Sequence, residues 1–185
     1  LRMSRGLGDV YKRQVYDFAS EHVDDLADGL YTFGSSVDGN FVLDVPGGTA
    51  SAGRKLQLYS GNKTNAQVWR VSHDQNGFVV IASVKGCTLD VPGGSASNGN
   101  PVQLWSDNGT LAQRWVAIKE TDGSYTLISA FNQSFAIDVA GGVAANGSAV
   151  QLYEANGTAA QRWVLTPAKT CLLYTSPSPR DMRRS

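Results

Sequence analysis

The segment from Asp90 to Trp115, DVPGGSASNGNPVQLWSDNGTLAQRW, contains the pattern that decides the fold, because the chain repeats it three times. In each copy an Asp-Val pair precedes two glycines, then Gln-Leu-aromatic, and finally Gln-x-Trp. The Asp and the Gln of Gln-x-Trp are 23 residues apart in every copy, starting at Asp44, Asp90 and Asp138. Only the spacing from one copy's Trp to the next copy's Asp varies, from 21 to 23 residues. Rigid spacing inside units with slack between them indicates one structural element used three times.

The local pattern within each unit is typical of β-structure. Short runs rich in aromatic and β-branched residues alternate with Gly, Pro and Asn turn formers; in the first unit the runs are Tyr31–Phe33, Phe41–Val45, Leu56–Tyr59 and Val68–Val71. Four short strands in each of three units predict an all-β chain of about twelve strands. A propeller needs at least four blades. We therefore expect a β-trefoil, in which six strands form a short barrel and six form hairpins that cap one end.

Composition excludes several classes of partner. The formal net charge is zero, which argues against binding to nucleic acid through a basic surface. No apolar run is long enough for a membrane span, so we expect no membrane insertion. No cluster of metal ligands or cofactor motif is apparent, and we expect no metal and no cofactor.

The two ends of the chain do not read as parts of the domain. Ser4–Gln14 reads SRGLGDVYKRQ, and Cys171–Arg180 reads CLLYTSPSPR. A DNA sequence that encodes the first segment encodes the second on its opposite strand, and this DNA resembles a transposase adapter used in sequencing. We therefore expect adapter-like artefacts at 1–14 and 169–185, a linker or short helix from an upstream region at 15–28, and the trefoil domain at 29–168. The natural protein is then expected to continue in both directions, linked to further domains.

The helix pattern before the domain covers Val15–Ala27, where apolar residues recur on one helical face. Cysteine use is uninformative about the compartment, because Cys171 lies in the adapter-like end. Cys87 is then the only native cysteine, and no internal disulfide can form.

The Gln-x-Trp triplet, in register with Asp-Val and Gln-Leu-aromatic, resembles the ricin B-type (QxW) lectin family, which includes carbohydrate-binding modules of family 13. The resemblance spans residues 30–166. It implies a β-trefoil that binds sugars in up to three shallow pockets, one per unit, lined by the Asp and by the aromatic after Gln-Leu.

The residue chemistry agrees with that implication. A carboxylate accepts two sugar hydroxyls with charge-assisted strength, an aromatic ring supplies apolar area beneath C–H groups, and an amide both donates and accepts hydrogen bonds. Each unit contains this set, and the candidate carbohydrate-binding residues are Asp44, Gln57, Tyr59, Asn62 and Gln67; Asp90, Gln103, Trp105, Asn108 and Gln113; and Asp138, Gln151, Tyr153, Asn156 and Gln161.

Structural roles compete with binding at most of these positions. The Asp residues could instead form the turns at Pro-Gly-Gly, the aromatics could pack in hairpins, the Asn residues could form tight turns, and the Gln-x-Trp glutamines could satisfy buried backbone groups. The Gln-x-Trp tryptophans are expected in the core. One departure from the family pattern also matters: family members with galactose pockets often have Asn directly before that glutamine, where this chain has Ala66, Ala112 and Ala160.

The leading hypothesis is a non-catalytic glycan-binding module of a larger bacterial protein, extracellular or on the cell surface as the family resemblance implies. Galactose-type and xylan-type glycans are the candidate partners. The alternative is a protein-interaction or spacer module that keeps the trefoil and has lost sugar binding. An enzyme is not expected, since no Ser/His/Asp arrangement appears and the three Asp residues lie in separate units.

Overall fold

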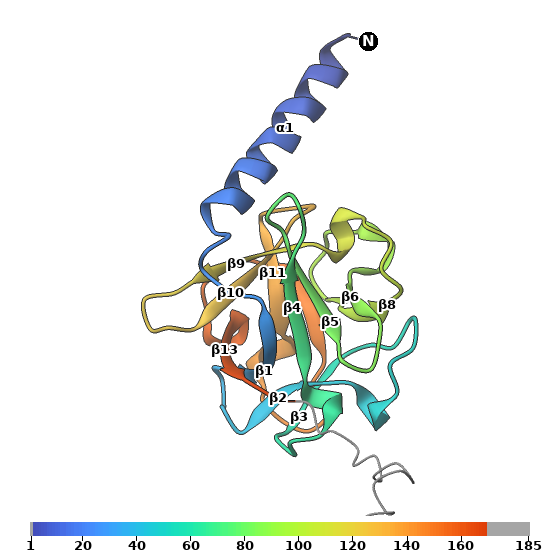
Figure 1. Ribbon diagram of the computed structural model, residues 1–185, viewed down its shortest axis with the longest axis vertical. Coiled ribbons are helices and arrows are strands. Elements are labelled where there is room, and N and C mark those ends of the chain that lie inside the picture. The colour runs from blue at the N-terminus through green and yellow to red at the C-terminus, as the bar shows by residue number, and fades with distance from the viewer. Residues whose placement is uncertain (1, 170–185) are drawn as a thin grey trace, which may run out of the picture.

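The computed structural model describes residues 2–169, with side chains from residue 10 onward. It contains an N-terminal helix, α1 (Arg2–Glu21), followed by a mostly β domain (Figure 1). The strands, in chain order, are β1 (Gly29–Ser35), β2 (Phe41–Asp44), β3 (Gln57–Ser60), β4 (Trp69–His73), β5 (Val79–Ser83), β6 (Thr88–Asp90), β7 (Asn100–Pro101), β8 (Gln103–Trp105), β9 (Trp115–Lys119), β10 (Tyr125–Ser129), β11 (Phe135–Val139), β12 (Val150–Glu154) and β13 (Arg162–Pro167).

Six of these strands close into an antiparallel barrel. The ring runs β1–β4–β5–β9–β10–β13 and returns to β1, and every neighbouring pair in it is hydrogen-bonded. The other strands form three hairpins, β2–β3, β6–β8 and β11–β12. Strands β7 and β8 together occupy the position of β3 and β12, interrupted at Val102. The prediction of a β-trefoil with four strands per unit is therefore confirmed.

The barrel interior is filled by the residues that recur in each unit. Trp69, Trp115 and Trp163 are all fully buried in one apolar cluster, which confirms their predicted place in the core. The indole N–H of Trp69 donates to the Leu43 carbonyl oxygen at 3.1 Å, and that of Trp163 donates to Ile137 at 3.3 Å. These bonds fasten the first and third hairpins to the barrel. The equivalent N–H of Trp115 has no acceptor within the described residues.

The three hairpins also bind one another around the pseudo-threefold axis. Isolated bridges join Lys55 to Gln103 and Gln57 to Ala149, and β12 pairs with β7. Side chains add to this contact: the Asn146 amide oxygen accepts the Ser60 backbone N–H at 2.7 Å. Each unit is therefore held in place by a neighbouring unit, so that the cap is continuous.

The turn after each Asp-Val pair has the same conformation in all three units. A single 3-10 turn covers Pro46–Gly48, and its equivalents cover Pro92–Gly94 and Ala140–Gly142. The middle glycine has a φ of 66–67° in every copy, which strongly favours glycine. The third turn keeps this geometry although Ala140 replaces proline, so the glycines decide the turn.

Helix α1 begins earlier and ends earlier than the pattern at Val15–Ala27 predicts, because it runs from Arg2 to Glu21. Its C-terminal part packs on the barrel: Val15 and Ala19 are buried against Phe78, Val116 and Ile128. Its N-terminal part projects away from the domain (Figure 1). Among the described residues, no helix combines the length and the apolar content needed to cross a membrane. The segment expected to be adapter-like at 1–14 forms most of this helix, and residues 170–185 of the C-terminal one lie outside the described residues.

Candidate functional site

Three open pockets lie on the capped part of the domain, one in each unit. Each pocket is bounded by the 3-10 turn after the Asp, by the outer strand of the hairpin, and by the loop before Gln-x-Trp. The cavity volumes are about 440, 480 and 460 Å³ for the first, second and third units, within the range typical of small-molecule sites. Twelve of the fifteen predicted residues line them: Asp44, Gln57, Tyr59 and Asn62; Asp90, Gln103, Trp105 and Asn108; and Asp138, Gln151, Tyr153 and Asn156.

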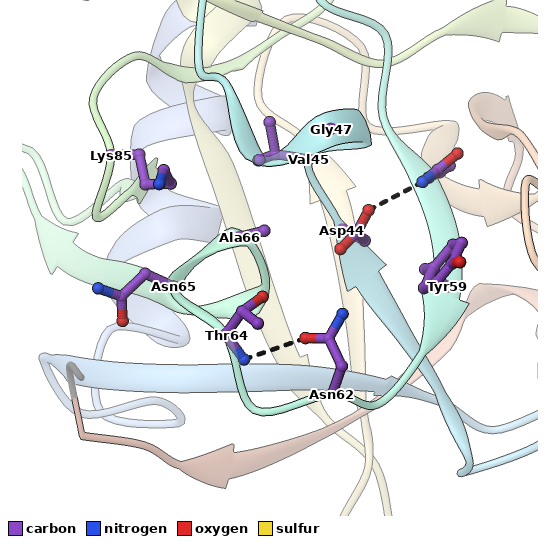
Figure 2. Close-up of a pocket in the computed structure, with 11 residues that line it drawn as sticks. Asp44, Val45, Gly47, Tyr59, Asn62, Thr64, Asn65, Ala66 and Lys85 are labelled. Atoms are coloured by element: carbon purple, nitrogen blue, oxygen red, sulfur yellow. Dashed lines mark hydrogen bonds between the residues drawn. The ribbon is translucent and has the colours of Figure 1, made fainter.

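The Asp carboxylate forms the floor of each pocket. Asp44 accepts a hydrogen bond from the Gln57 amide nitrogen at 2.8 Å and another from Gln67 at 3.2 Å (Figure 2 shows the first). Gln103 donates to Asp90 in the same way at 2.7 Å. An ionised carboxylate has about four acceptor positions. Two therefore remain on Asp44 for hydroxyl groups of a ligand.

Burial changes the ionisation of two of these carboxyls. Removal from water raises the pKa of Asp44, and the hydrogen bonds donated by Gln57 and Gln67 offset this only in part. The pKa of Asp138 is raised for the same reason, with Gln151 and Gln161 as the partial offset. Neutral amides hold these carboxylates in place, and none of the ion pairs among the described side chains involves their oxygens.

The three Gln-x-Trp glutamines lie behind the pockets and do not line them. Gln67 is 1% exposed, and Gln113 and Gln161 are fully buried. The Gln67 amide nitrogen donates to the Ser60 carbonyl oxygen as well as to Asp44, while its oxygen accepts the backbone N–H of Asn62 at 2.8 Å. One glutamine thus fixes both the carboxylate and the loop before Gln-x-Trp, which is called the binding loop below. This is a positioning role, and it leaves no surface for ligand contact.

The Asn of each loop combines a turn role with an exposed donor. The Asn62 side-chain oxygen accepts the Thr64 backbone N–H at 3.0 Å, and Asn108 and Asn156 repeat this bond. Figure 2 shows the Asn62 amide nitrogen on the side facing Asp44. The turn interpretation and the binding interpretation are therefore compatible, because the amide oxygen closes the turn while the amide nitrogen faces the pocket.

The aromatic of each pocket is unusually exposed for its type. Tyr59, Trp105 and Tyr153 are 40%, 43% and 36% exposed, although they follow fully buried leucines. In Figure 2 the Tyr59 ring stands at one side of the pocket, beside Asp44. The rings are therefore not hairpin packing residues, and each offers a face to the pocket.

The carboxylates do not form the Pro-Gly-Gly turns. The first turn is closed by backbone, with the Gly48 N–H donating to the Val45 carbonyl oxygen at 2.8 Å. The side chain of Asp44 bonds to the glutamines of its own unit instead. The turn geometry therefore accounts for the glycines, and the position of the carboxylate on the pocket floor accounts for the Asp.

The alanines before Gln-x-Trp leave room in the pocket wall. Ala66 lines the first pocket, Ala112 the second and Ala160 the third. A Cβ atom added to Gly48 would lie 3.8 Å from the Ala66 Cβ atom. The methyl groups therefore sit against the glycine turns, and the polar group implied by the family pattern is absent in every unit.

Sequence reasoning missed two sets of lining residues. The threonines of the binding loops, Thr64, Thr110 and Thr158, belong to the pockets of their own units. Lys85, Phe131 and Val37 line the first, second and third pockets although each belongs to another unit. The repeat shows the first set, but only the three-dimensional structure brings the second set to the sites. Among the described residues, no three His, Cys, Asp or Glu side chains form a group that could hold a metal ion.

Several solved structures share this architecture. A designed threefold-symmetric protein, ThreeFoil, is 29% identical with a TM-score of 0.71, covering 75% of this chain and 98% of its own. An exo-β-1,3-galactanase from Clostridium thermocellum is 26% identical with a TM-score of 0.71, and the match covers 76% of this chain and 30% of the galactanase chain. The C-terminal half of an earthworm R-type lectin, solved in complex with GalNAc, is 19% identical with a TM-score of 0.58, covering 76% of this chain and 99% of that one.

The family assignment rests on a sequence match. A search of curated proteins found no match. The model of the ricin-type β-trefoil lectin domain-like family matches residues 12–105 and 111–179, which is most of the chain and includes all three units. The chain therefore belongs to the ricin-type β-trefoil lectin domain-like family.

Proposed function

We propose that the chain is a non-catalytic carbohydrate-binding module of a larger secreted or surface-attached bacterial protein, and that it binds glycans through three shallow pockets. The observation that carries this proposal is the convergence, in every unit, of a carboxylate and an exposed aromatic ring on one open pocket. Asp44 with Tyr59, Asp90 with Trp105, and Asp138 with Tyr153 are the three pairs. A sugar presents hydroxyls at its edge and C–H groups on its face, which such a pair matches.

Family and neighbours support the sugar class in general terms. The lectin-like family and the earthworm lectin solved with GalNAc point to carbohydrate. The galactanase match covers only a minor part of that enzyme, as expected for a binding module attached to a catalytic domain. Galactose-type and xylan-type glycans remain the proposed ligands.

Binding without catalysis is supported by the arrangement of the carboxyls. Glycoside hydrolysis requires two carboxyl groups that flank one glycosidic bond. Each pocket is lined by a single Asp, and no other Asp or Glu lines it in the described part of the chain.

The spacer hypothesis is favoured by one observation, the alanines at 66, 112 and 160. It requires that the remaining carboxylate, amide and ring do not suffice for binding. The exposed rings count against it, because a pure spacer has no need to hold apolar surface open to water in three equivalent places.

The test is binding of the full chain to a glycan array and to insoluble polysaccharides, with two triple variants. The first, Asp44→Ala with Asp90→Ala and Asp138→Ala, removes the acceptors. The second, Tyr59→Ala with Trp105→Ala and Tyr153→Ala, removes exposed rings and leaves the buried glutamine bonds intact. We expect binding by the native chain and at least a tenfold loss in both variants, because a single stacking or charge-assisted contact contributes about 1–3 kcal/mol.

Folding of each variant is checked by near-ultraviolet circular dichroism from the buried tryptophans and by thermal melting. The aromatic variant is the decisive one, since it removes no buried hydrogen bond. Retention of native-level binding by the folded aromatic variant, or no binding by the native chain, would favour the spacer module.

A further inference from the structure

Each pocket is completed by a residue from a different unit, and these three residues differ in chemistry. Lys85 lines the pocket of Asp44, Phe131 lines that of Asp90, and Val37 lines that of Asp138. All three occupy one equivalent position, two residues after a serine that ends a barrel strand: Ser83, Ser129 and Ser35. The Lys85 and Val37 backbone N–H groups donate to the hydroxyls of their serines at 3.2 Å. The wall position is therefore fixed by the fold, while its side chain is free to vary.

The pocket extends from the aromatic ring to this wall. In Figure 2, Tyr59 stands on one side of Asp44, and Lys85 lies on the other side, beyond Ala66. The small side chain of Ala66 separates the two parts of the pocket without closing the passage. A saccharide seated on Asp44 and Tyr59 can continue past Ala66 toward Lys85, so the wall residue contacts a second sugar unit or a substituent of the first.

The first pocket is the only one of the three with a cationic wall. Lys85 is exposed, and no carboxylate lies within ion-pair distance of its ammonium group among the residues whose side chains are described. The binding loop of this pocket also contains Lys63, where the other loops have Gly109 and Gly157.

The other two binding loops are acidic near their start. Asp107 directly precedes Asn108 in the second loop, and Glu154 stands two residues before Asn156 in the third. The first loop has Ser60 and Gly61 at those two positions. Asp107 pairs with Arg114 at 3.3 Å, so charge distinguishes the first pocket from the second at its wall, and from the third at both its wall and its loop.

The loop that contains Lys85 is also the shortest of the three. Ala82 pairs with Thr88, whereas Gly34 pairs with Val42 and Ile128 with Ala136, so the intervening segment is two residues shorter. This shortening accounts for the reduced spacing between the first and second repeats. It is accommodated by Gly86 at φ 106° and by Cys87 at φ 64°, a conformation that is uncommon outside glycine. The first pocket thus has its own loop geometry as well as its own charge.

We infer that the first pocket selects acidic saccharides, which carry a carboxylate or sulfate group, through Lys85, while the second and third pockets bind neutral saccharides against Phe131 and Val37. This inference rests on the proposed function and adds a ligand class to one site. An ammonium group pairs with an anionic oxygen by a charge-assisted hydrogen bond. The apolar walls of the other pockets offer an anion no partner.

The experiment uses matched pairs of oligosaccharides with the full, isotope-labelled chain. One pair is a xylo-oligosaccharide with and without a glucuronic acid branch, and the other is a galacto-oligosaccharide with and without a sulfate group; the two pairs distinguish a carboxylate from a sulfate. Backbone amide shifts of Asn62, Asn108 and Asn156 in NMR spectra report the three pockets separately.

The expected result is an affinity about threefold to fivefold higher for the acidic member at the first pocket in low salt, and no such preference elsewhere. The preference falls at 0.5 M salt because the pair is exposed. Lys85→Gln abolishes it, so that the acidic and neutral members bind the first pocket with equal affinity, while Lys119→Gln, an exposed lysine on the β9 strand, leaves it unchanged. Val37→Lys creates the preference in the third pocket.

Failure of this inference is distinguishable from failure of the proposed function. Equal affinities for both members at the first pocket, unchanged by Lys85→Gln, would overturn the inference while binding itself stands. Absence of shift changes with every saccharide at every pocket would overturn the proposed function as well.

Discussion

Asp44 and Asp138 are carboxyls on the floors of open pockets, and partial removal from water raises the pKa of both. Binding needs the ionised form, because only a carboxylate can accept from two hydroxyls with charge-assisted strength. Folding stability, in contrast, favours the protonated form of these two carboxyls. A raised folded-state pKa stabilises the fold below the unfolded value of about 3.9, and this contribution is lost as pH rises through the folded value.

The first prediction follows from that opposition. As the pH is lowered, the affinity for a neutral oligosaccharide at the first and third pockets should begin to fall before the pH reaches about 3.9, the ordinary midpoint of an exposed Asp. Protonation of these two carboxyls should not destabilise the fold over the same range. Calorimetric titration at pH 7, 5 and 4, with thermal melts at each pH, measures both quantities. Constant affinity down to pH 4, or a fall that only follows unfolding, would contradict the prediction.

At the residue scale, the sequence predicts which residues belong to the pockets better than it predicts where their side chains point. The repeat identifies the Asp, the amides and the aromatics, and the structure brings twelve of them to the pocket surfaces. It does not reveal that Gln67 lies behind Asp44, because a buried amide and an exposed one have the same letter and the same spacing. The position of Lys85 recurs two residues after a serine in every unit, but its residue type differs each time, so the repeat did not single it out as a site residue.

At the scale of elements, the hairpins are tied together by asparagines whose pattern is incomplete. The Asn146 side chain accepts the Ser60 backbone N–H at 2.7 Å, and Asn98 accepts that of Glu154 at 2.8 Å. The third equivalent position, facing Ser106, is Ala52, and the neighbouring Gly53 N–H makes the same bond to Leu104 that Gly147 makes to Leu58. The backbone at this third position therefore has the same geometry as at the other two, but Ala52 has no side-chain oxygen to accept the Ser106 N–H.

The second prediction is that Ala52→Asn stabilises the domain by about 1 kcal/mol, the typical net contribution of one hydrogen bond. Urea unfolding followed by tryptophan fluorescence measures the gain. Ala52→Leu is the control, because it has a similar size and no acceptor. An equal gain from both substitutions, or none from Asn, would show that the interlock does not form at this position.

The third prediction concerns the arginines within Gln-x-Trp. Arg114 is 9% exposed and pairs with Asp74 at 3.0 Å, whereas Arg162 is 29% exposed and pairs with Asp122 at 3.3 Å. Arg114→Met should cost about 2 kcal/mol, because it leaves a partly buried carboxylate without its cation, and Arg162→Met about 0.5 kcal/mol. Thermal melting should show a fall of about 6 °C for the first and near 1 °C for the second. Equal costs would mean that burial does not set the strength of these pairs.

Element boundaries show where local sequence reasoning ends. The strands were predicted closely because alternating apolar residues and glycine turns fix them locally. The early start of α1 was missed, because residues 1–14 were set aside as an adapter-like segment and their helical pattern was not considered. The closed ring of β1, β4, β5, β9, β10 and β13 follows from repetition, because three copies of one unit must pack symmetrically to bury their tryptophans.

At the scale of the whole molecule, three pockets on one rigid cap make binding to a polymer different from binding to a short sugar. Once one pocket is occupied by a polysaccharide, the others meet further sugar units at high effective concentration. The fourth prediction is that Tyr153→Ala removes one site for a soluble oligosaccharide without changing the affinity of the other two. On an insoluble polysaccharide the same substitution should raise the apparent Kd about tenfold, because simultaneous engagement is lost.

The control for that prediction is the truncation to alanine of an exposed apolar side chain outside the pockets. Val164→Ala removes an exposed apolar side chain from β13 and should change neither measurement. Calorimetry with the oligosaccharide and depletion binding with the polysaccharide give the two values. If Tyr153→Ala weakens both equally, or weakens neither, the pockets act one at a time, and threefold symmetry then serves the packing of the barrel rather than the capture of a polymer.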